Sequence, residues 1–496
     1  MCPLAAGGDW PAASAEPRKR VPSGRGTYSR DPHSRREGCR SSFQALRAHQ
    51  RFTMRKFGLL SKALPKLQTK NVPGEHTSFM NELALERKPS ILRELMKNHA
   101  TASKNVVFIG EGLPHPETIP FSEVSFTLKD GTKKVFTGSE LVTAINYLPT
   151  QGNPKLVQKL REFMDRFHAP LRWEDRDVIA TAGSQDGLSK VIEMSLQKGD
   201  AIVVADPVYS GLASNVRPYK AQLISAQYRK NGLDTVEMKD KLTAIWSSRS
   251  KDVKIPKILY INPVANNPSG HVISDEQKRE IYEIACEFNL LVLEDDPYYF
   301  LGFQDELPKS FLSMDTENRV VRFDSFSKIF GGGLRAGWMT GPKEIVRIVE
   351  MHMQVSVLHA SSLTQAIVLQ ILEEQGWDGF LDYTKNVKEF YRKRRDQMVA
   401  LADKYLTGLA EWDVPEGGMF LWVKVKGVSD VLAMVMERGL KKDVMLIPGH
   451  AFMSDPTKPC PYIRLSYSLV PMEDVEKAMQ RLAELIKEEQ AIESQK

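Results

Sequence analysis

The sequence predicts an α/β fold with a large domain built on a mainly parallel sheet and a second, small α+β domain. From about residue 104, short apolar segments that suit buried strands alternate with segments of helical periodicity. Beyond about 345 a long helical stretch, 343–407, gives way to strand-like segments and a final helix. No apolar run approaches the roughly 18 residues that a membrane span needs.

A series of short apolar segments is expected to form the large sheet, because such segments separated by helices pair as parallel strands covered on both faces. The segment 184–199 has Leu188, Val191, Ile192 and Leu196 at helical spacing, and 274–288 is another expected helix. The expected strands lie in NVVFIG (105–110), LRWEDRDVIATAG (171–183), AIVVADP (201–207), QLISAQY (222–228), KILYINP (257–263), LLVLEDD (290–296), VVRFDSFS (320–327) and AGWMTGP (336–342).

The C-terminal part is expected to form the small domain from WDVPEGGMFLWVKV, VMLIPG and YIRLSYS. Its last helix carries Val475, Met479, Leu482 and Ile486 on one face, which predicts core packing rather than a partner surface. The expected division is 1–74 for a basic disordered head, 75–115 for an N-terminal arm and part of the small domain, 116–385 for the large domain and 386–496 for the C-terminal small domain.

Positive charge is concentrated in the head. Residues 1–74 carry 15 Lys and Arg against 4 Asp and Glu, whereas 75–496 carry 53 against 58. The body is therefore not expected to bind nucleic acid or other polyanions in general. Residues 1–53 have the composition of a disordered segment. From Met54 to Lys70 there is no acidic residue, and Phe57, Leu60, Leu64 and Leu67 share a helical face opposite Lys62, Lys66 and Lys70, with Pro65 interrupting.

This basic amphipathic segment favours a mitochondrial transit peptide, and hence a matrix location. A solvated basic tail in a cytoplasmic protein, or an arm for nucleic acid or a membrane surface, remains an alternative. Met54 is also a possible true start. The scattered cysteines (Cys2, Cys39, Cys286 and Cys460) predict free thiols and no disulfide framework, and no metal site is expected; His450 is interpreted as a loop residue.

The stretch FDSFSKIFGGGLRAGWMTG (323–341) is the most informative. A nucleotide phosphate loop needs its lysine after the glycines, followed by Ser or Thr, so Lys328 before the glycines excludes that motif. Hydroxyls, backbone N–H groups and Arg335 around an amine could instead hold a phosphate beside a nucleophile.

Polar residues also follow the other expected strands: Ser184 and Gln185, then Tyr209, Asn267 and Asp295. Because ligands bind at the carboxyl ends of parallel strands, these residues are expected to meet Ser325, Ser327 and Lys328 in one crevice.

The set matches the needs of an aldehyde cofactor that carries a ring nitrogen and a phosphate. Lys328 would bond the aldehyde and move protons, and Asp295, in preference to Asp296, would keep the ring nitrogen protonated. Asn267 and Tyr298 would bind the ring hydroxyl, and Tyr209 would stack on the ring unless it is a core aromatic.

Phosphate requires charge and donors. Arg335, Ser325 and Ser327 supply them, together with the helix start at Ser184 and Gln185. Arg464, within an apolar strand, would bind a substrate carboxylate unless it forms a structural salt bridge.

These motifs resemble the fold-type I pyridoxal-phosphate (PLP) aminotransferases, in particular the kynurenine/α-aminoadipate type, over about residues 80–490. The matching runs are GLPHPETIPF, TAGSQDGLSKV, NNPSG, LEDDPYYFL, SFSKIFGGGLRAGWMTGP, LTGLAEWDVPEGGMFLWVKVKG and PYIRLSYS. Two features depart from the family: Ser269 replaces a commoner Thr, and Phe330 with three glycines replaces a serine-containing turn.

The resemblance implies that Lys328 is the catalytic lysine, that PLP is bound by the residues matched above, and that Arg464 and Asn267 face the substrate. It further implies that Tyr147 reaches the active site of the other subunit of a homodimer, that Gly112 lies against substrate, and that Arg93 meets its distal part; for Arg93 a solvated surface arginine is the alternative.

The implied activity is transamination of 2-aminoadipate, kynurenine and other aromatic or large amino acids, with 2-oxoglutarate as acceptor, as in lysine degradation and other amino acid metabolism. A broad aromatic aminotransferase is the nearest alternative, and β-elimination is a possible side reaction. A PLP-binding regulator with an aminotransferase-like body would need a DNA-binding domain, for which the head lacks the apolar pattern.

Overall fold

The computed structural model describes residues 76–100, 109–110, 112–229, 232–248 and 253–495. The chain divides into two units, Met1–Lys70 and Asn71–Lys496, and every described residue belongs to the second. The basic head, its transit segment and residues 105–108 of the first expected strand lie outside the described residues.

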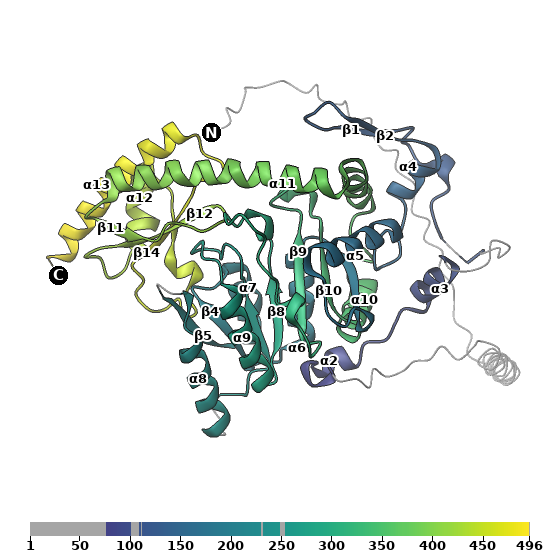
Figure 1. Cartoon of the computed structure of the whole chain (residues 1–496), viewed down its shortest axis with the longest axis horizontal. Coiled ribbons are helices and arrows are strands. Elements are labelled where there is room, and N and C mark those ends of the chain that lie inside the picture. The colour runs from purple at the N-terminus through teal and green to yellow at the C-terminus, as the bar shows by residue number, and fades with distance from the viewer. Residues whose placement is uncertain (1–75, 101–108, 111, 230–231, 249–252, 496) are drawn as a thin grey trace, which may run out of the picture. The chain divides into compact units, whose positions relative to one another are not determined.

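A large mixed sheet forms the centre of the second unit (Figure 1). Strands β4, β5, β7, β8 and β9 are parallel, and β10 is antiparallel to both of its neighbours, β3 and β9. The expected parallel sheet is therefore confirmed except at β10 and at the short β6. The strand order is β3 (Arg176–Thr181), β10 (Gly337–Pro342), β9 (Val320–Ser325), β8 (Leu291–Asp295), β7 (Ile258–Ile261), β4 (Ala201–Asp206), β5 (Gln222–Arg229) and β6 (Gly232–Leu233).

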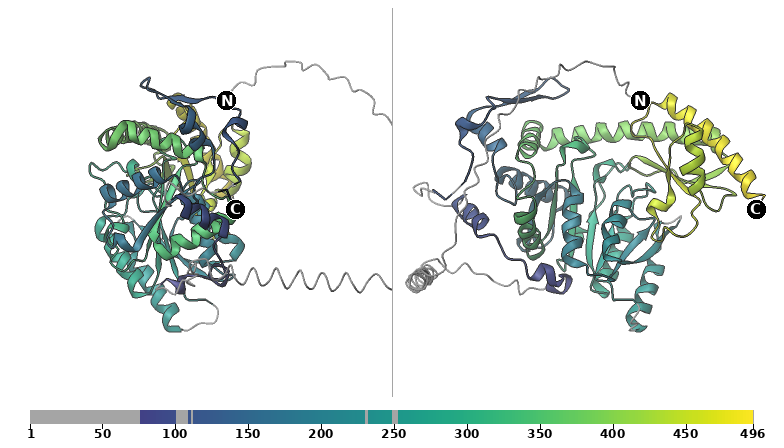
Figure 2. Two further views of the ribbon diagram at one scale, coloured as in Figure 1. Left: turned by 90° about the vertical axis from the view of Figure 1, so that its right-hand side faces the viewer. Right: turned by 180° about the vertical axis from the view of Figure 1, so that it is seen from behind.

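Helices cover both faces of this sheet (Figure 2). Both faces are covered because successive side chains of a strand point to opposite faces and both sets are apolar. On β4, for example, Val203 belongs to the apolar core on one face and Val204 to the core on the other. Helices α5 (Pro154–His168), α8 (Thr235–Ser248) and α9 (Asp275–Glu287) pack on the first face. Helices α6 (Ser184–Ser195), α7 (Ser210–Val216) and α10 (Lys343–Ser356) pack on the second, together with the short α2 (Glu82–Leu85).

The long α11 (Ser362–Leu406) joins the large domain to the small one (Figure 1). Its first part contributes Leu372 and Phe380 to a core of the large sheet, and its second part contributes Met398 and Ala402 to the core of the small domain. The expected helical stretch 343–407 is thus two helices, and Gly376, with φ 60°, kinks the second.

The small domain packs an antiparallel sheet against α11 and the last helix, α13 (Met472–Glu493). The apolar face expected on that helix is confirmed, because Val475, Met479, Leu482 and Ile486 are all buried. The strand order is β11 (Ala410–Trp412), β12 (Phe420–Val425), β14 (Tyr462–Ser466) and β13 (Ile447–Pro448), with α12 (Gly439–Lys441) beside them.

The N-terminal elements include one feature that the sequence analysis missed, the hairpin of β1 (Val124–Thr127) and β2 (Lys133–Phe136). The turn signal was the pair Asp130 and Gly131, whose φ is 91°. Helices α3 (Ile91–Ala100) and α4 (Gly138–Ile145) flank this part of the chain. Among the described residues, no helix is long and apolar enough to cross a membrane.

Candidate active site

A cavity of about 220 Å³ opens at the carboxyl ends of the central strands, where the sequence predicts a crevice. All of the predicted cofactor residues except Tyr147 meet there, from segments that are far apart in the sequence. The residues that line it are Ser184, Gln185, Tyr209, Asn262, Asn267, Asp295, Pro297, Tyr298, Ser325, Ser327, Lys328, Gly332, Arg335 and Phe420.

The turn after β9 places the lysine and the predicted phosphate ligands. Ser325 Oγ accepts a hydrogen bond from Ser327 N at 3.1 Å, which tightens the chain just before Lys328. Arg335 donates to Ser327 Oγ at 3.3 Å and to the carbonyl of Ala182 at 2.9 Å. Gly183, with φ 82°, makes this approach possible, because a Cβ there would lie 2.3 Å from the guanidinium of Arg335.

The start of α6 adds backbone donors to the same end of the cavity. Ser184 and Gln185 are its first two residues, and the first N–H groups of a helix have no acceptor within the helix. Together with the hydroxyls of Ser325 and Ser327 and the guanidinium of Arg335, they form a cluster of donors suited to a phosphate dianion.

Asp295 also lines the cavity. Its Oδ2 accepts a hydrogen bond from the Tyr260 hydroxyl at 2.8 Å, and Asn262 Nδ2 donates to its backbone carbonyl at 2.6 Å. Its Oδ1 is buried and has no hydrogen-bond partner among the described residues. Burial raises the pKa of Asp295 to about 6, although the Tyr260 hydrogen bond lowers it.

Asp296, the alternative to Asp295, belongs to a different set of charges. Asp296 follows the end of β8 and does not line the cavity; its buried carboxylate accepts a hydrogen bond from Arg322 at 3.1 Å. Arg322 is fully buried and also pairs with Glu294 at 2.9 Å and with Asp324 at 2.8 Å. Burial raises the pKa of Asp296, and it raises that of Asp324 to about 6.

Lys328 presents its amine to the cavity from an environment that favours the neutral form. Burial lowers the pKa of Lys328, and Arg335 and Arg464 lower it further, whereas Asp295 raises it. Its Nζ lies 5.6 Å from the centre of the Tyr298 ring. Burial also raises the pKa of Tyr209, which keeps that phenol protonated. A lysine with a depressed pKa is a better nucleophile at neutral pH.

Arg464 reaches the site from β14. Its NH1 donates to Asn267 Oδ1 at 2.9 Å, and its Cζ lies 4.0 Å from the Phe420 ring centre and 4.8 Å from that of Phe452. Its Nε is buried without a hydrogen-bond partner among the described residues, and burial lowers its pKa. A carboxylate ligand would relieve this cost. No salt bridge of Arg464 occurs among the described residues.

Three predicted residues lie apart from this cavity in the single chain. Tyr147 is half exposed, with its ring edge-on to His359 at 5.9 Å, and Gly112 is exposed in the N-terminal arm. Arg93, on α3, is buried and donates to the carbonyl of Leu148 at 2.6 Å and to Thr150 Oγ1 at 3.1 Å. Their predicted roles in binding are not tested by this geometry.

Sequence reasoning missed Tyr260, Asn262 and Phe420. Asn262 directly follows the end of β7, so its place at a strand end was a usable signal, and its Oδ1 accepts from Asn267 N at 3.0 Å. Tyr260 and Phe420 lie in apolar strands and resemble core residues in the sequence.

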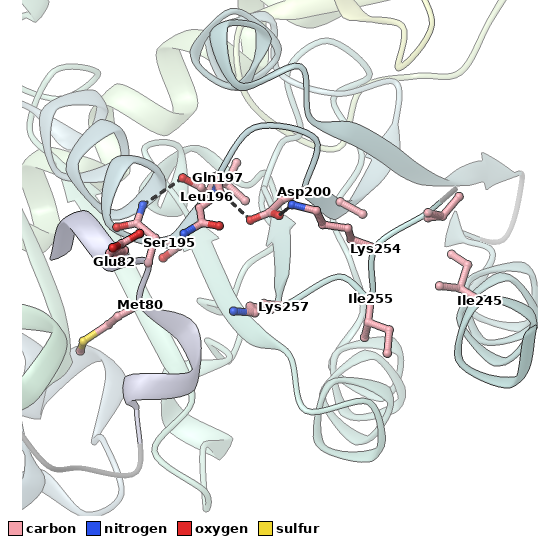
Figure 3. Close-up of a pocket in the computed structure, with 13 residues that line it drawn as sticks. Met80, Glu82, Ser195, Leu196, Gln197, Asp200, Ile245, Lys254, Ile255 and Lys257 are labelled. Carbon is pink, nitrogen blue, oxygen red and sulfur yellow. Dashed lines mark hydrogen bonds and ion pairs between the residues drawn. The ribbon is translucent and has the colours of Figure 1, made fainter. Parts of the chain in front are cut away.

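A larger cavity, of about 610 Å³, lies at the opposite, amino end of the sheet (Figure 3). Its lining includes Glu82 of α2, Ser195 of α6 and Lys257 before β7, and Asp200 there pairs with Lys254 at 2.7 Å. It lacks the convergence of strand-end residues found at the other edge. Within the described part of the chain, no group of His, Cys, Asp and Glu has the arrangement of a metal site.

The comparisons with known proteins agree with this geometry. Residues 128–482 match the family of aminotransferase class I and II, so the chain belongs to that family of PLP-dependent enzymes. A mitochondrial kynurenine/alpha-aminoadipate aminotransferase of Bos taurus is 40% identical over 422 residues, which cover 83% of this chain and 99% of the relative. An aromatic-amino-acid aminotransferase of Thermococcus litoralis is 30% identical over 417 residues, which cover 84% of this chain and 95% of the relative.

Solved structures show the same fold. The crystal structure of aminotransferase Aro8 from Candida albicans has a TM-score of 0.74 at 25% identity and covers 84% of this chain and 99% of its own. The crystal structure of a kynurenine aminotransferase of Pyrococcus horikoshii has a TM-score of 0.65 at 28% identity, and it covers 84% of this chain and 98% of its own. The predicted fold, the aminotransferase class and the PLP cofactor are thereby confirmed.

The raised pKa of Asp295 leads to a stability prediction for the cofactor-free protein. An ionised carboxylate with a folded pKa near 6, instead of 3.8, opposes folding above pH 6 and costs nothing below pH 3.8. Asp295→Asn should therefore increase the free energy of unfolding by about 3 kcal/mol at pH 8 and by little at pH 4. Urea denaturation at both pH values measures this, with the exposed Asp305→Asn as control. An equal gain at both pH values would contradict the assignment.

Proposed function

We propose that the protein transfers the amino group of 2-aminoadipate, kynurenine and other aromatic or large amino acids to 2-oxoglutarate. The observation that carries the proposal is one cavity lined by Lys328, an amine with a lowered pKa, and by Asp295, a buried carboxylate. The cation of Arg464 lies directly behind two residues of the same lining, Asn267 and Phe420. The substrate classes are proposed from the names of relatives, which include the bovine and the Thermococcus enzymes.

The residues of the cavity fit PLP. The unpartnered Oδ1 of Asp295 is a buried acceptor that a protonated ring nitrogen would satisfy, and the donor cluster of Ser184, Gln185, Ser325 and Arg335 would hold the phosphate. The backbone at Gly332 lines the same cavity and would supply donors where the family has a further hydroxyl. When bound, PLP supplies an aldehyde for the amino group and a ring that accepts electrons from the α-carbon.

The side chains around the ring would hold it in place. Asn267 and Tyr298 would donate to the ring hydroxyl, and Tyr209 would cover a ring face. Tyr298 is itself fixed by Phe420, with ring centres 6.3 Å apart at 81°. Asp295 remains ionised at neutral pH when a cation is beside it, because a positive neighbour lowers a carboxyl pKa.

Lys328 would be the general base and acid of the reaction. Its lowered pKa would let the neutral amine take the α-proton of the donor amino acid near neutral pH. The resulting ammonium would then return a proton to the cofactor carbon that carried the aldehyde. The donor and the acceptor would use the same cavity in turn, so the kinetics would be ping-pong.

Arg464 would bind the α-carboxylate, aligned by Asn267. The more remote contacts belong to the same proposal: Gly112 against the substrate, Arg93 with its distal group, and Tyr147 reaching the cavity of a second subunit in a homodimer. The mitochondrial names of the mammalian relatives support a mitochondrial location and a transit role for part of the head.

Replacing the lysine tests the central step. Lys328→Ala should lower kcat by about 10³-fold or more, because both proton transfers and the bond to the cofactor aldehyde are lost. The measurement is the visible absorption of the PLP-loaded protein before and after addition of 2-aminoadipate or kynurenine, followed by turnover with 2-oxoglutarate. Lys257→Ala, an exposed lysine at the other end of the sheet, should behave as wild type. Turnover by Lys328→Ala within about ten-fold of wild type would contradict the role.

Arg464→Gln tests the carboxylate site. Loss of a partly buried cation that binds a carboxylate should reduce kcat/KM by about 10²-fold or more, with PLP affinity changed only a few-fold. Steady-state kinetics and a PLP titration measure the two effects, and Arg481→Gln in the same domain is the control. A fall in PLP affinity as large as the fall in kcat/KM would show that Arg464 serves the cofactor instead.

A further inference from the structure

A carboxylate of the large domain binds the small domain close to Arg464. Asp206 is the last residue of β4 and is only 4% exposed. Its carboxylate accepts a hydrogen bond from the Ser454 hydroxyl at 2.6 Å and a longer one from the Ser454 backbone N–H at 3.3 Å. Ser454 follows the short helix Gly449–Phe452 in the small domain. One buried side chain therefore binds two donors of a residue from the other domain.

Further hydrogen bonds hold both Asp206 and Ser454 in this contact. Gln227, which is paired with Asp206 in the register of β4 and β5, donates to its Oδ2 at 3.1 Å. Ser225 Oγ lies 3.2 Å from Ser454 Oγ. In addition, the backbone N–H of Val208 donates to the carbonyl of Phe452 at 2.6 Å. Residues 452–454 are thus attached to the large domain at Phe452 and again at Ser454.

Phe452 is the side chain that this attachment fixes. It is 1% exposed, and its ring packs edge-on against Trp422, with centres 5.7 Å apart at 85°. The same ring contacts the guanidinium of Arg464, and Phe420 contacts that guanidinium as well. A cation held against aromatic rings keeps its direction, which a long arginine side chain would otherwise lose to rotamer freedom.

We propose that the hydrogen bond between Asp206 and Ser454 positions Arg464, through Phe452, for the carboxylate of the substrate. Asp206 and Ser454 touch neither the cofactor nor the substrate in this proposal, so they are positioning residues. The proposal rests on the proposed function, since it requires Arg464 to bind the substrate. A displacement of about 1 Å at a group that binds the substrate is enough to lower kcat/KM by a large factor, and here the loss should appear in KM.

The test removes the hydroxyl of Ser454 in the full-length, PLP-loaded protein. Ser454→Ala should raise KM for the amino donor and for the 2-oxo acid about ten-fold, with kcat within about two-fold, because a hydrogen bond to a charged group is lost. PLP affinity should not change. Ser454→Thr keeps the hydroxyl and should restore the wild-type KM. Ser429→Ala is the matched control, because its hydroxyl also binds a carboxylate, Glu493, elsewhere in the small domain.

A binding measurement separates positioning from a general structural role. The 2-methyl derivative of the donor has no α-proton, so its effect on the cofactor spectrum reports binding alone. Its Kd should rise about ten-fold in Ser454→Ala, whereas an amine with the same side chain but no carboxylate should bind both proteins equally. If the wild type turns over, an unchanged KM in Ser454→Ala would overturn the positioning role. Weakening of amine binding in Ser454→Ala by the same factor as binding of the 2-methyl donor would overturn it as well. A wild type that converts no amino acid would overturn the proposed function, and this inference with it.

Discussion

The active-site end of the sheet depends on one buried cation. Arg322, on β9, binds Glu294 and Asp296 from the chain at the end of β8, and Asp324 from its own strand. Glu294 in turn accepts the backbone N–H groups of Phe311 and Leu312. These contacts hold together the ends of two neighbouring strands, which carry Asp295 and Lys328 into the cavity. Buried carboxylates without a cation would be too costly to keep.

The site is shared between two packed cores. The large sheet supplies the lysine, the carboxylate and the donor cluster, whereas the small domain supplies Arg464 and Phe420. Each domain has its own apolar core, and α11 runs through both. The separation between the amine of Lys328 and the guanidinium of Arg464, the proposed substrate cation, therefore depends on how the two domains are joined. The bond from Arg464 to Asn267 and the bridge from Asp206 to Ser454 are two polar links that fix this relation.

Much of the sheet and of the cofactor cradle follows from local sequence. The apolar strand segments and the polar residues that follow them can be recognised from neighbouring residues alone. They predict one crevice for Lys328, Asp295 and Tyr209, and these three residues do line one cavity. Tyr260 and Phe420 could not be found in this way, because in an apolar strand only packing decides which side chain meets the ligand. The choice between Asp295 and Asp296 likewise depends on tertiary contacts, because Asp295 lines the cavity whereas Asp296 pairs with the buried Arg322. Tyr147 and Gly112 lie apart from the cavity of the single chain, and their proposed roles rest only on the family resemblance.

The most direct test of this account is the pH dependence of stability in Arg322→Met. The variant keeps an apolar side chain of similar length but leaves Glu294, Asp296 and Asp324 unpaired, so urea denaturation should show a loss of about 3–5 kcal/mol at pH 8. Protonation removes the cost of unpaired carboxylates, so the difference from wild type should shrink steadily as the pH falls toward 5. A loss of the same size at pH 5 and pH 8 would show that Arg322 acts through packing alone, and would contradict the central role given to its charge.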